Sequence, residues 1–205
     1  MQVERSADRI VRADILVKDW LTEPPSVDAV RPGRCLGCGT ASRPVGAGLA
    51  IRGHGLRERV QFGPRSPDGH GEVLVIPVRR YLCRCGAVMT VVPRGILRSR
   101  LYAAAAISLA LGLWGLVGRP SPAVRARVSP WPSFGEAARH RWKTVARWVD
   151  DGAAGRLFPR LDVIADGDRR ATARRLATAL IGFAPPGDRH RDQESLLYLG
   201  GAHAA

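Results

Sequence analysis

The chain has 205 residues, 45% of them hydrophobic, which allows one or two small folded domains and excludes an intrinsically disordered chain. Its 32 Lys and Arg residues against 18 Asp and Glu give a formal net charge of +14, so a polyanion is the natural partner. Charged residues interrupt any export signal before residue 15, and we therefore expect a cytoplasmic protein with reduced thiols.

The first predicted element is a short amphipathic segment over residues 8–21, which a Pro24-Pro25 pair ends. We assign residues 1–29 to an N-terminal segment that precedes the first domain. The apolar residues of the amphipathic segment are Ile10, Val11, Ile15, Leu16 and Trp20.

Four cysteines form two close pairs, each followed by a glycine. Thiolates suit Zn²⁺, and the glycine lets the backbone turn so that both sulfurs of a pair point toward one ion. The second pair has a one-residue spacer, so its turn must be tighter than the first. We predict one structural zinc ion per chain, with the ligands Cys35, Cys38, Cys83 and Cys85.

Other roles of these cysteines stay open at this point: structural thiols, a disulfide pair, or a redox CxxC motif. His54 or His70, which lie between the two pairs, could also replace a thiolate as a ligand. The paired spacing favours zinc. Because four cysteines fill a tetrahedron, no Lewis-acid chemistry is implied.

The predicted zinc-ribbon domain spans residues 30–95. Residues 40–71 are rich in Gly, Pro and polar residues, which predicts a long loop or an irregular hairpin. Residues 72–78 and 87–92 are strand candidates on either side of the second cysteine pair. A strand, a CxCG turn and a strand make a zinc-ribbon β-hairpin.

The next region should be helical. Residues 101–118 carry no charge, but their Ala and Gly content and the arginines on both sides predict a buried core helix and no membrane span. Ser121 as N-cap and Pro122 at the first helical position predict a short helix through Val128.

A last helix in this region is predicted over about 134–150. Ser133 and Glu136 form a capping-box signature at its start. Residues at spacings of three and four give it one apolar face. That face consists of Trp142, Val145 and Val149.

Basic residues concentrate around this helix, since residues 94–147 hold ten basic side chains and one acid. Three helices with short breaks, the last one basic, predict a helix-turn-helix-like domain over residues 96–155 that binds double-stranded DNA. The alternative is a basic, solvated helix on a small bundle. The basic candidates for DNA contact are Arg139, Arg141, Lys143 and Arg147.

Residues 156–205 should form a helical extension with a helix at about 169–183 and a mobile tail from Asp188. Strand transfer by a nuclease requires a carboxylate cluster that holds divalent ions, and too little chain follows Asp150 for the sheet that would build one. We therefore expect no catalytic residues and no enzymatic activity. The acids assigned to turns and an N-cap are Asp162, Asp166 and Asp168.

A series of motifs resembles an uncharacterised bacterial family of transposase-like domains, similar to the zinc-ribbon plus helix-turn-helix N-terminal region of insertion-sequence transposases. The resemblance covers about residues 30–150. It implies zinc at the four cysteines and DNA contact from the helix that holds Lys143, Thr144 and Arg147. In order, the motifs are CxxCG, Gly53-His54-Gly55-Leu56-Arg57, Arg80-Tyr81-Leu82-Cys83, Val91-Val92-Pro93, Arg100-Leu101-Tyr102 and a Trp-x-Thr-x-x-Arg-Trp helix over 142–148.

The sequence thus predicts an α+β chain in which a small zinc-ribbon module precedes a mainly α-helical, helix-turn-helix-like domain. Its predicted function is zinc-dependent binding of duplex DNA without a nuclease core, with a transposase or another protein as a further partner. The alternative function is a zinc-ribbon adaptor that docks on a protein without reading DNA.

Overall fold

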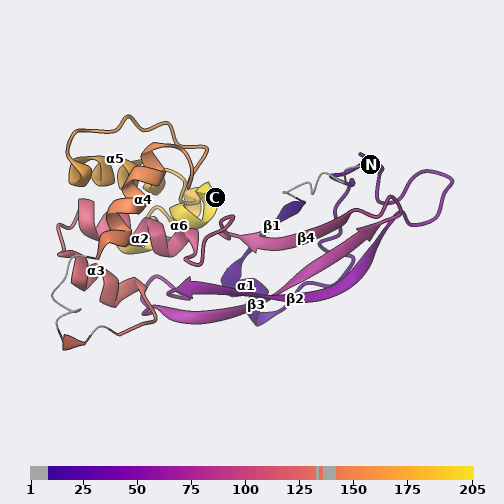
Figure 1. Ribbon diagram of the computed structural model, residues 1–205, viewed down its shortest axis with the longest axis horizontal. Helices are drawn as coiled ribbons and strands as arrows, with labels where there is room; N and C mark the ends of the chain where they lie inside the picture. The colour runs from indigo at the N-terminus through magenta and orange to yellow at the C-terminus, as the bar shows by residue number, and fades with distance from the viewer. Residues whose placement is uncertain (1–8, 133, 136–141) are drawn as a thin grey trace. The chain divides into compact units, whose positions relative to one another are not determined.

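The computed structural model describes residues 9–132, 134–135 and 142–205 (Figure 1). Within these residues the fold is mixed, with a four-stranded sheet and six α-helices. The chain divides into two compact units. The first comprises Met1–Arg59 and Val75–Arg94, and the second comprises Val60–Leu74 and Gly95–Ala205.

The sheet has the strand order β1-β4-β3-β2. Strands β3 and β4 are antiparallel, with Arg80 opposite Thr90, whereas β1 runs parallel to β4 and places Ile10 beside the same Thr90. Cys83 ends β3 and Cys85 lies in the turn between β3 and β4, which confirms the predicted strand, CxCG turn and strand. The strands are β1 Ile10–Leu16, β2 Ile51–Gly63, β3 Glu72–Cys83 and β4 Val88–Arg94.

Two predictions for the N-terminal half were wrong. For residues 40–71 the loop alternative is wrong, because they contain the 13-residue strand β2, whereas the hairpin alternative is compatible with β2 lying beside β3 in the sheet. Residues 52–58 of β2 are exposed on an edge strand, so the sequence lacks the polar–apolar alternation of a half-buried strand. The segment 8–21 is not one amphipathic element either, since it forms β1 and then the short helix α1, Val17–Thr22.

Two buried aromatic residues tie the N-terminal segments to β3. Trp20 of α1 donates its Nε1–H to the Pro77 carbonyl at 2.9 Å, and the Tyr81 hydroxyl donates to the Val27 carbonyl at 2.7 Å. Both rings are fully buried, and a buried indole or phenol requires a partner for its polar atom. These bonds fix α1 and the chain before the first cysteine pair against the strand that leads to the second pair.

The second unit is built around α2, Ala104–Gly115, of which eleven of twelve residues are buried. The prediction of a buried core helix in the uncharged stretch is therefore confirmed. The buried Ser108 hydroxyl donates to the Leu197 carbonyl at 2.7 Å. No helix among the described residues is long and apolar enough to cross a membrane. The helices that contact α2 are α3 Ser121–Val128, α4 Lys143–Ala153, α5 Arg169–Ile181 and α6 Gln193–Ala204.

The start of α3 differs by one residue from the predicted start. Pro120 is the N-cap, so Ser121 is the first helical residue and does not cap its own helix. The Ser121 Oγ instead accepts the Trp142 N–H at 3.1 Å. A serine identified as a cap in the sequence thus satisfies a donor at the beginning of a different helix, α4.

The predicted helix over 134–150 also needs correction, because α4 begins at Lys143. Val145 and Val149 are buried as expected, but Trp148 completes the apolar face, and Trp142 precedes the helix as its half-buried N-cap. The capping box expected at positions 133 and 136 lies outside the described residues.

The predicted mobile tail is wrong, because residues from Gln193 onward form α6 and pack on α2 and α5. A Cβ atom on Gly201 would lie 2.8 Å from the Ala104 carbonyl oxygen, and one on Gly200 would lie 2.8 Å from the Leu180 carbonyl carbon. Gly200 and Gly201, which suggested a mobile tail in the sequence, therefore allow the backbone of α6 to lie close to the backbones of α5 and α2.

We predict that Gly200→Ala destabilises the protein. Helix propensity alone would make alanine more favourable by about 1 kcal/mol, but a Cβ at this position collides with backbone that cannot move aside. Overpacking of this kind costs about 1–3 kcal/mol, which urea unfolding would measure. Gly187→Ala, where a Cβ meets nothing within 4 Å, is the control and should not lower the stability. A Gly200→Ala protein as stable as the parent would contradict the α5–α6 packing.

Candidate metal centre

The first cysteine pair lies in a tight turn from Cys35 to Thr40. The Cys35 N–H donates to the Thr40 carbonyl at 2.9 Å, and the Gly39 N–H donates to the Cys35 carbonyl at 2.9 Å. Gly39 has a φ of 73°, in the left-handed region that favours glycine. The glycine after the pair is therefore required by the backbone of the turn.

The second pair repeats this arrangement between β3 and β4. The Cys83 N–H donates to the Ala87 carbonyl at 2.9 Å, the Gly86 N–H donates to the Cys83 carbonyl at 2.9 Å, and Gly86 has a φ of 85°. The closing hydrogen bond spans one residue fewer than in the first turn. This is the tighter turn that the one-residue spacer predicts.

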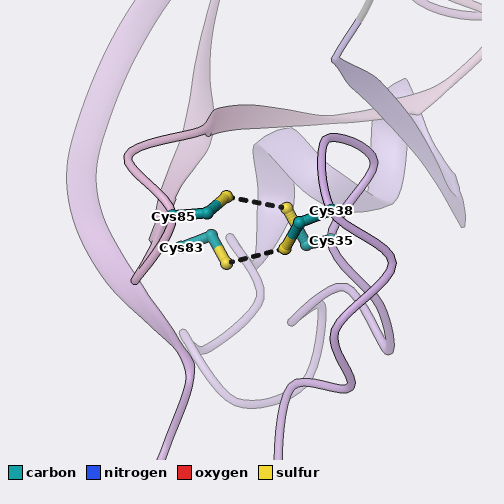
Figure 2. Close-up of side chains that lie close together, drawn as sticks. All are labelled: Cys35, Cys38, Cys83 and Cys85. Atoms are coloured by element: carbon teal, nitrogen blue, oxygen red, sulfur yellow. Dashed lines mark hydrogen bonds between the residues drawn. The ribbon is translucent and has the colours of Figure 1, made fainter.

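The two turns bring all four sulfur atoms together (Figure 2). Cys35 Sγ lies 3.7 Å from Cys85 Sγ, Cys38 Sγ lies 3.8 Å from Cys83 Sγ, and the four sulfurs lie within 4.8 Å of one another. Cys35 and Cys83 are buried, whereas Cys38 and Cys85 are exposed. The cluster could hold a metal ion.

The sulfur–sulfur distances fit a tetrahedral metal site and do not fit a disulfide. A tetrahedron with metal–sulfur bonds of about 2.3 Å has edges of about 3.8 Å, which is the separation of the two close sulfur pairs. A disulfide requires a sulfur–sulfur distance of about 2.05 Å, and all four cysteines are free thiols. Each short distance also joins the two turns, so a bound ion would connect them.

The surroundings of the thiols affect their ionisation in opposite directions. The Thr40 hydroxyl and N–H lower the pKa of Cys38 to about 6. At Cys83, the Cys85 N–H lowers the pKa, but burial and the neighbouring sulfurs together outweigh it and raise the pKa to about 12. Four adjacent thiols cannot all lose their protons unless a cation balances them, so metal binding here would release protons.

No histidine or carboxylate of the described residues joins this cluster. Among the described residues, the four cysteines are the only group of three or more metal-ligating side chains that could hold an ion. His54 lies exposed on β2 and His70 lies exposed before β3. Asp168 is the N-cap of α5, as predicted, and Asp166 pairs with Arg175 at 2.9 Å.

The predicted DNA contacts are only partly placed. Lys143 and Arg147 are exposed one helical turn apart on α4, and neither forms an ion pair with a described residue. Thr144, between them, is half-buried. Arg139 and Arg141 lie outside the described residues.

Several other arginines of the basic region are engaged within the protein. Arg94 pairs with Asp14, and Arg100 pairs with Asp151 at 2.8 Å. Glu194 forms ion pairs with two further arginines, Arg119 at 3.7 Å and Arg127 at 3.4 Å. Part of the basic excess therefore stabilises the fold, whereas Lys143 and Arg147 of α4 have no such partner in the part of the chain that the structure describes.

A groove of about 1040 Å³ lies beside Lys143 and Arg147, and sequence reasoning missed it. Its wall also contains Trp114 at the end of α2 and Arg169 and Arg170 at the start of α5. The sequence predicted the helices α2 and α5. No local pattern indicates that the start of α5 lies beside the end of α2.

Comparison with known protein families, with curated proteins and with solved structures found no match to this chain. The geometry of the cysteine cluster and of α4 must therefore carry the functional argument, and the resemblance to transposases stays a prediction.

We predict that the purified protein contains one zinc ion per chain and that Cys83→Ser removes it. Because metal binding to such a site contributes folding free energy, chelation should lower the melting temperature of the parent protein. Elemental analysis and thermal unfolding measure both effects. His54→Ala, which changes an exposed histidine outside the cluster, should retain the metal. Metal-free protein with a melting temperature unaffected by chelation would contradict the site.

Proposed function

We propose that this chain is a zinc-stabilised DNA-binding protein without a nuclease core. Cys35, Cys38, Cys83 and Cys85 would hold one structural Zn²⁺ in a zinc-ribbon-like module, and α4 would contact duplex DNA. The observation that carries the DNA contact is the pair of exposed cations on α4, Lys143 and Arg147, which have no ion-pair partner among the described residues, in a chain with a net charge of +14.

The donor set supports zinc as the metal. Soft thiolate ligands in a tetrahedral arrangement favour Zn²⁺ over the hard cations Mg²⁺ and Ca²⁺, which prefer oxygen. Four protein ligands leave no open position for a substrate or water. The ion would therefore stabilise the two turns and take no part in chemistry.

The packing of α4 within the second unit supports its role as a DNA-contacting helix. Val145, Trp148 and Val149 bury one side of the helix, so the opposite side is held in a fixed orientation. Lys143 and Arg147 project from that exposed side and can neutralise phosphates, and an arginine can also form paired hydrogen bonds with a guanine edge.

In this proposal α4 has the role of the recognition helix in a helix-turn-helix domain. The proposed similarity to a helix-turn-helix domain is limited to DNA contact through α4. The turn differs, because residues 129–142 lie between α3 and α4, whereas the turn of a helix-turn-helix motif has about 3–4 residues. The property shared with transposases would then be DNA binding. A separate protein would catalyse any strand transfer.

The carboxylates of the second unit support a non-catalytic role. Strand transfer by two divalent ions needs carboxylates that are free to ligate them. In the described residues the acids near α4 and α5 are engaged instead: Asp150 pairs with Arg169, Asp151 pairs with Arg100, and Asp168 caps α5.

We predict that Lys143→Gln and Arg147→Gln each weaken binding to duplex DNA. Removing the charge that neutralises one phosphate should lower the slope of log K against log salt by about one, and an arginine that reads a base should also lose about 1–3 kcal/mol on the preferred site. Fluorescence anisotropy at two salt concentrations would measure both quantities.

Matched controls come from the same chain. Lys18→Gln and Arg189→Gln remove the same charge from exposed positions outside α4 and should leave affinity nearly unchanged. Equal losses in all four variants would indicate a diffuse basic surface and contradict a contact through α4. No duplex affinity near physiological salt would favour the protein-adaptor alternative.

We also predict that the chain alone does not cleave DNA. Supercoiled plasmid with Mg²⁺ or Mn²⁺ should remain intact at protein concentrations that retard it in a gel. Asp166→Ala is the informative variant, because this acid belongs to the Asp162, Asp166 and Asp168 group. Nicking by the parent that this substitution abolishes would overturn the non-catalytic proposal.

A further inference from the structure

The groove beside α4 collects the beginnings of three helices of the second unit. Ser121 belongs to the start of α3, Lys143 to the start of α4 and Arg170 to the start of α5, and all three line it. Several amide groups at these helix beginnings already have partners, because Asp168 accepts those of Arg170 and Ala171 and the Ser121 Oγ accepts that of Trp142, so the attraction of the groove for an anion comes from its basic side chains. At about 1040 Å³ the groove lies just above the usual range of small-ligand sites, about 300–1,000 Å³.

Four basic side chains line the groove against two acids, and both acids already have partners. Asp150 forms two hydrogen bonds with Arg169, each 3.0 Å long, and Asp168 accepts the backbone N–H groups of Arg170 and Ala171. Lys143 and Arg147 have no ion pair with any described residue. The uncompensated charge of the groove is therefore positive.

Two indoles give the groove an aromatic wall. Trp142 is held by edge-to-face contacts with Trp148 at 5.0 Å and Tyr102 at 6.1 Å between ring centroids. The Arg170 guanidinium carbon lies 5.5 Å from the centroid of the Trp114 ring. Both indoles are half-buried, so each retains exposed surface. Rigid indoles and guanidinium planes are the groups on which single-stranded nucleic acids stack their bases.

We propose that this groove binds an unpaired nucleotide of DNA, with its base against Trp114 and Trp142 and its phosphate at Lys143 and Arg147. The inference deepens the proposed DNA binding, because it adds a single-stranded feature such as an overhang or a flipped base to the duplex. Anions and aromatic bases are both accommodated here, and a base with its attached phosphate is the unit of nucleic acid that supplies both.

The test compares a blunt duplex with the same duplex carrying a short single-stranded overhang. The full chain loaded with zinc should bind the overhang duplex about fivefold or more tightly than the blunt one, since stacking of one base is worth at least this factor. Trp114→Leu should abolish the preference. Trp131→Leu, which changes an exposed indole outside the groove, should keep it.

A second groove variant tests the proposal independently, in case Trp114→Leu impairs folding. Arg170→Gln changes a lining side chain that contacts the Trp114 ring and should also reduce the overhang preference, whereas Arg189→Gln should not. Thermal unfolding of each variant confirms that the fold is retained. A preference that disappears in both groove variants and persists in both controls is the expected result.

The outcomes separate this inference from the proposed function. Equal affinity for blunt and overhang duplexes would overturn the nucleotide site and leave duplex binding intact. An overhang preference that survives both groove substitutions would place the single-strand contact elsewhere and also overturn it. Binding of a single strand that both groove substitutions weaken, without any duplex affinity, would support the groove and reject duplex recognition.

Discussion

Four thiols from two distant turns must meet at one point, and the arrangement of the first unit depends on this constraint. Cys38 and Cys83 are 45 positions apart in the chain, yet their sulfurs lie 3.8 Å apart. The β3–β4 ladder and the hydrogen bonds of Trp20 and Tyr81 hold one turn and the chain before the other in place. A metal ion held here would add the remaining connection, because each short sulfur pair contains one sulfur from each turn.

The second unit depends on a different constraint, the close approach of helix backbones around α2. A Cβ on Gly115 would lie 2.6 Å from the Arg174 amide nitrogen, so this position admits only glycine without a shift of α5. A helix buried on all sides must satisfy its polar groups internally, which Ser108 does through the Leu197 carbonyl. Trp114 is the exception on α2, because it is half-buried and reaches the groove beside α4.

Local patterns predicted well those features whose cause is local. The CxCG turn, the Asp168 cap and the buried stretch of α2 each follow from a few neighbouring residues. The failures involve partners far along the chain. Strand β2 lies at the edge of the sheet and lacks alternation, Ser121 accepts a hydrogen bond from the start of another helix, and the glycines of α6 are explained only by their contacts with α2 and α5. The same reason explains the site: the spacing identified the cysteines, whereas the groove arises from helix beginnings that no sequence pattern brings together.

The unequal exposure of the four sulfurs has a kinetic consequence. Cys38 and Cys85 face solvent, and each belongs to a different turn. A competing chelator or a proton would therefore reach one ligand of each turn first, while Cys35 and Cys83 stay shielded. An ion held here would leave by loosening both turns together, so the rate of metal exchange would report on the opening of the connection between the two turns.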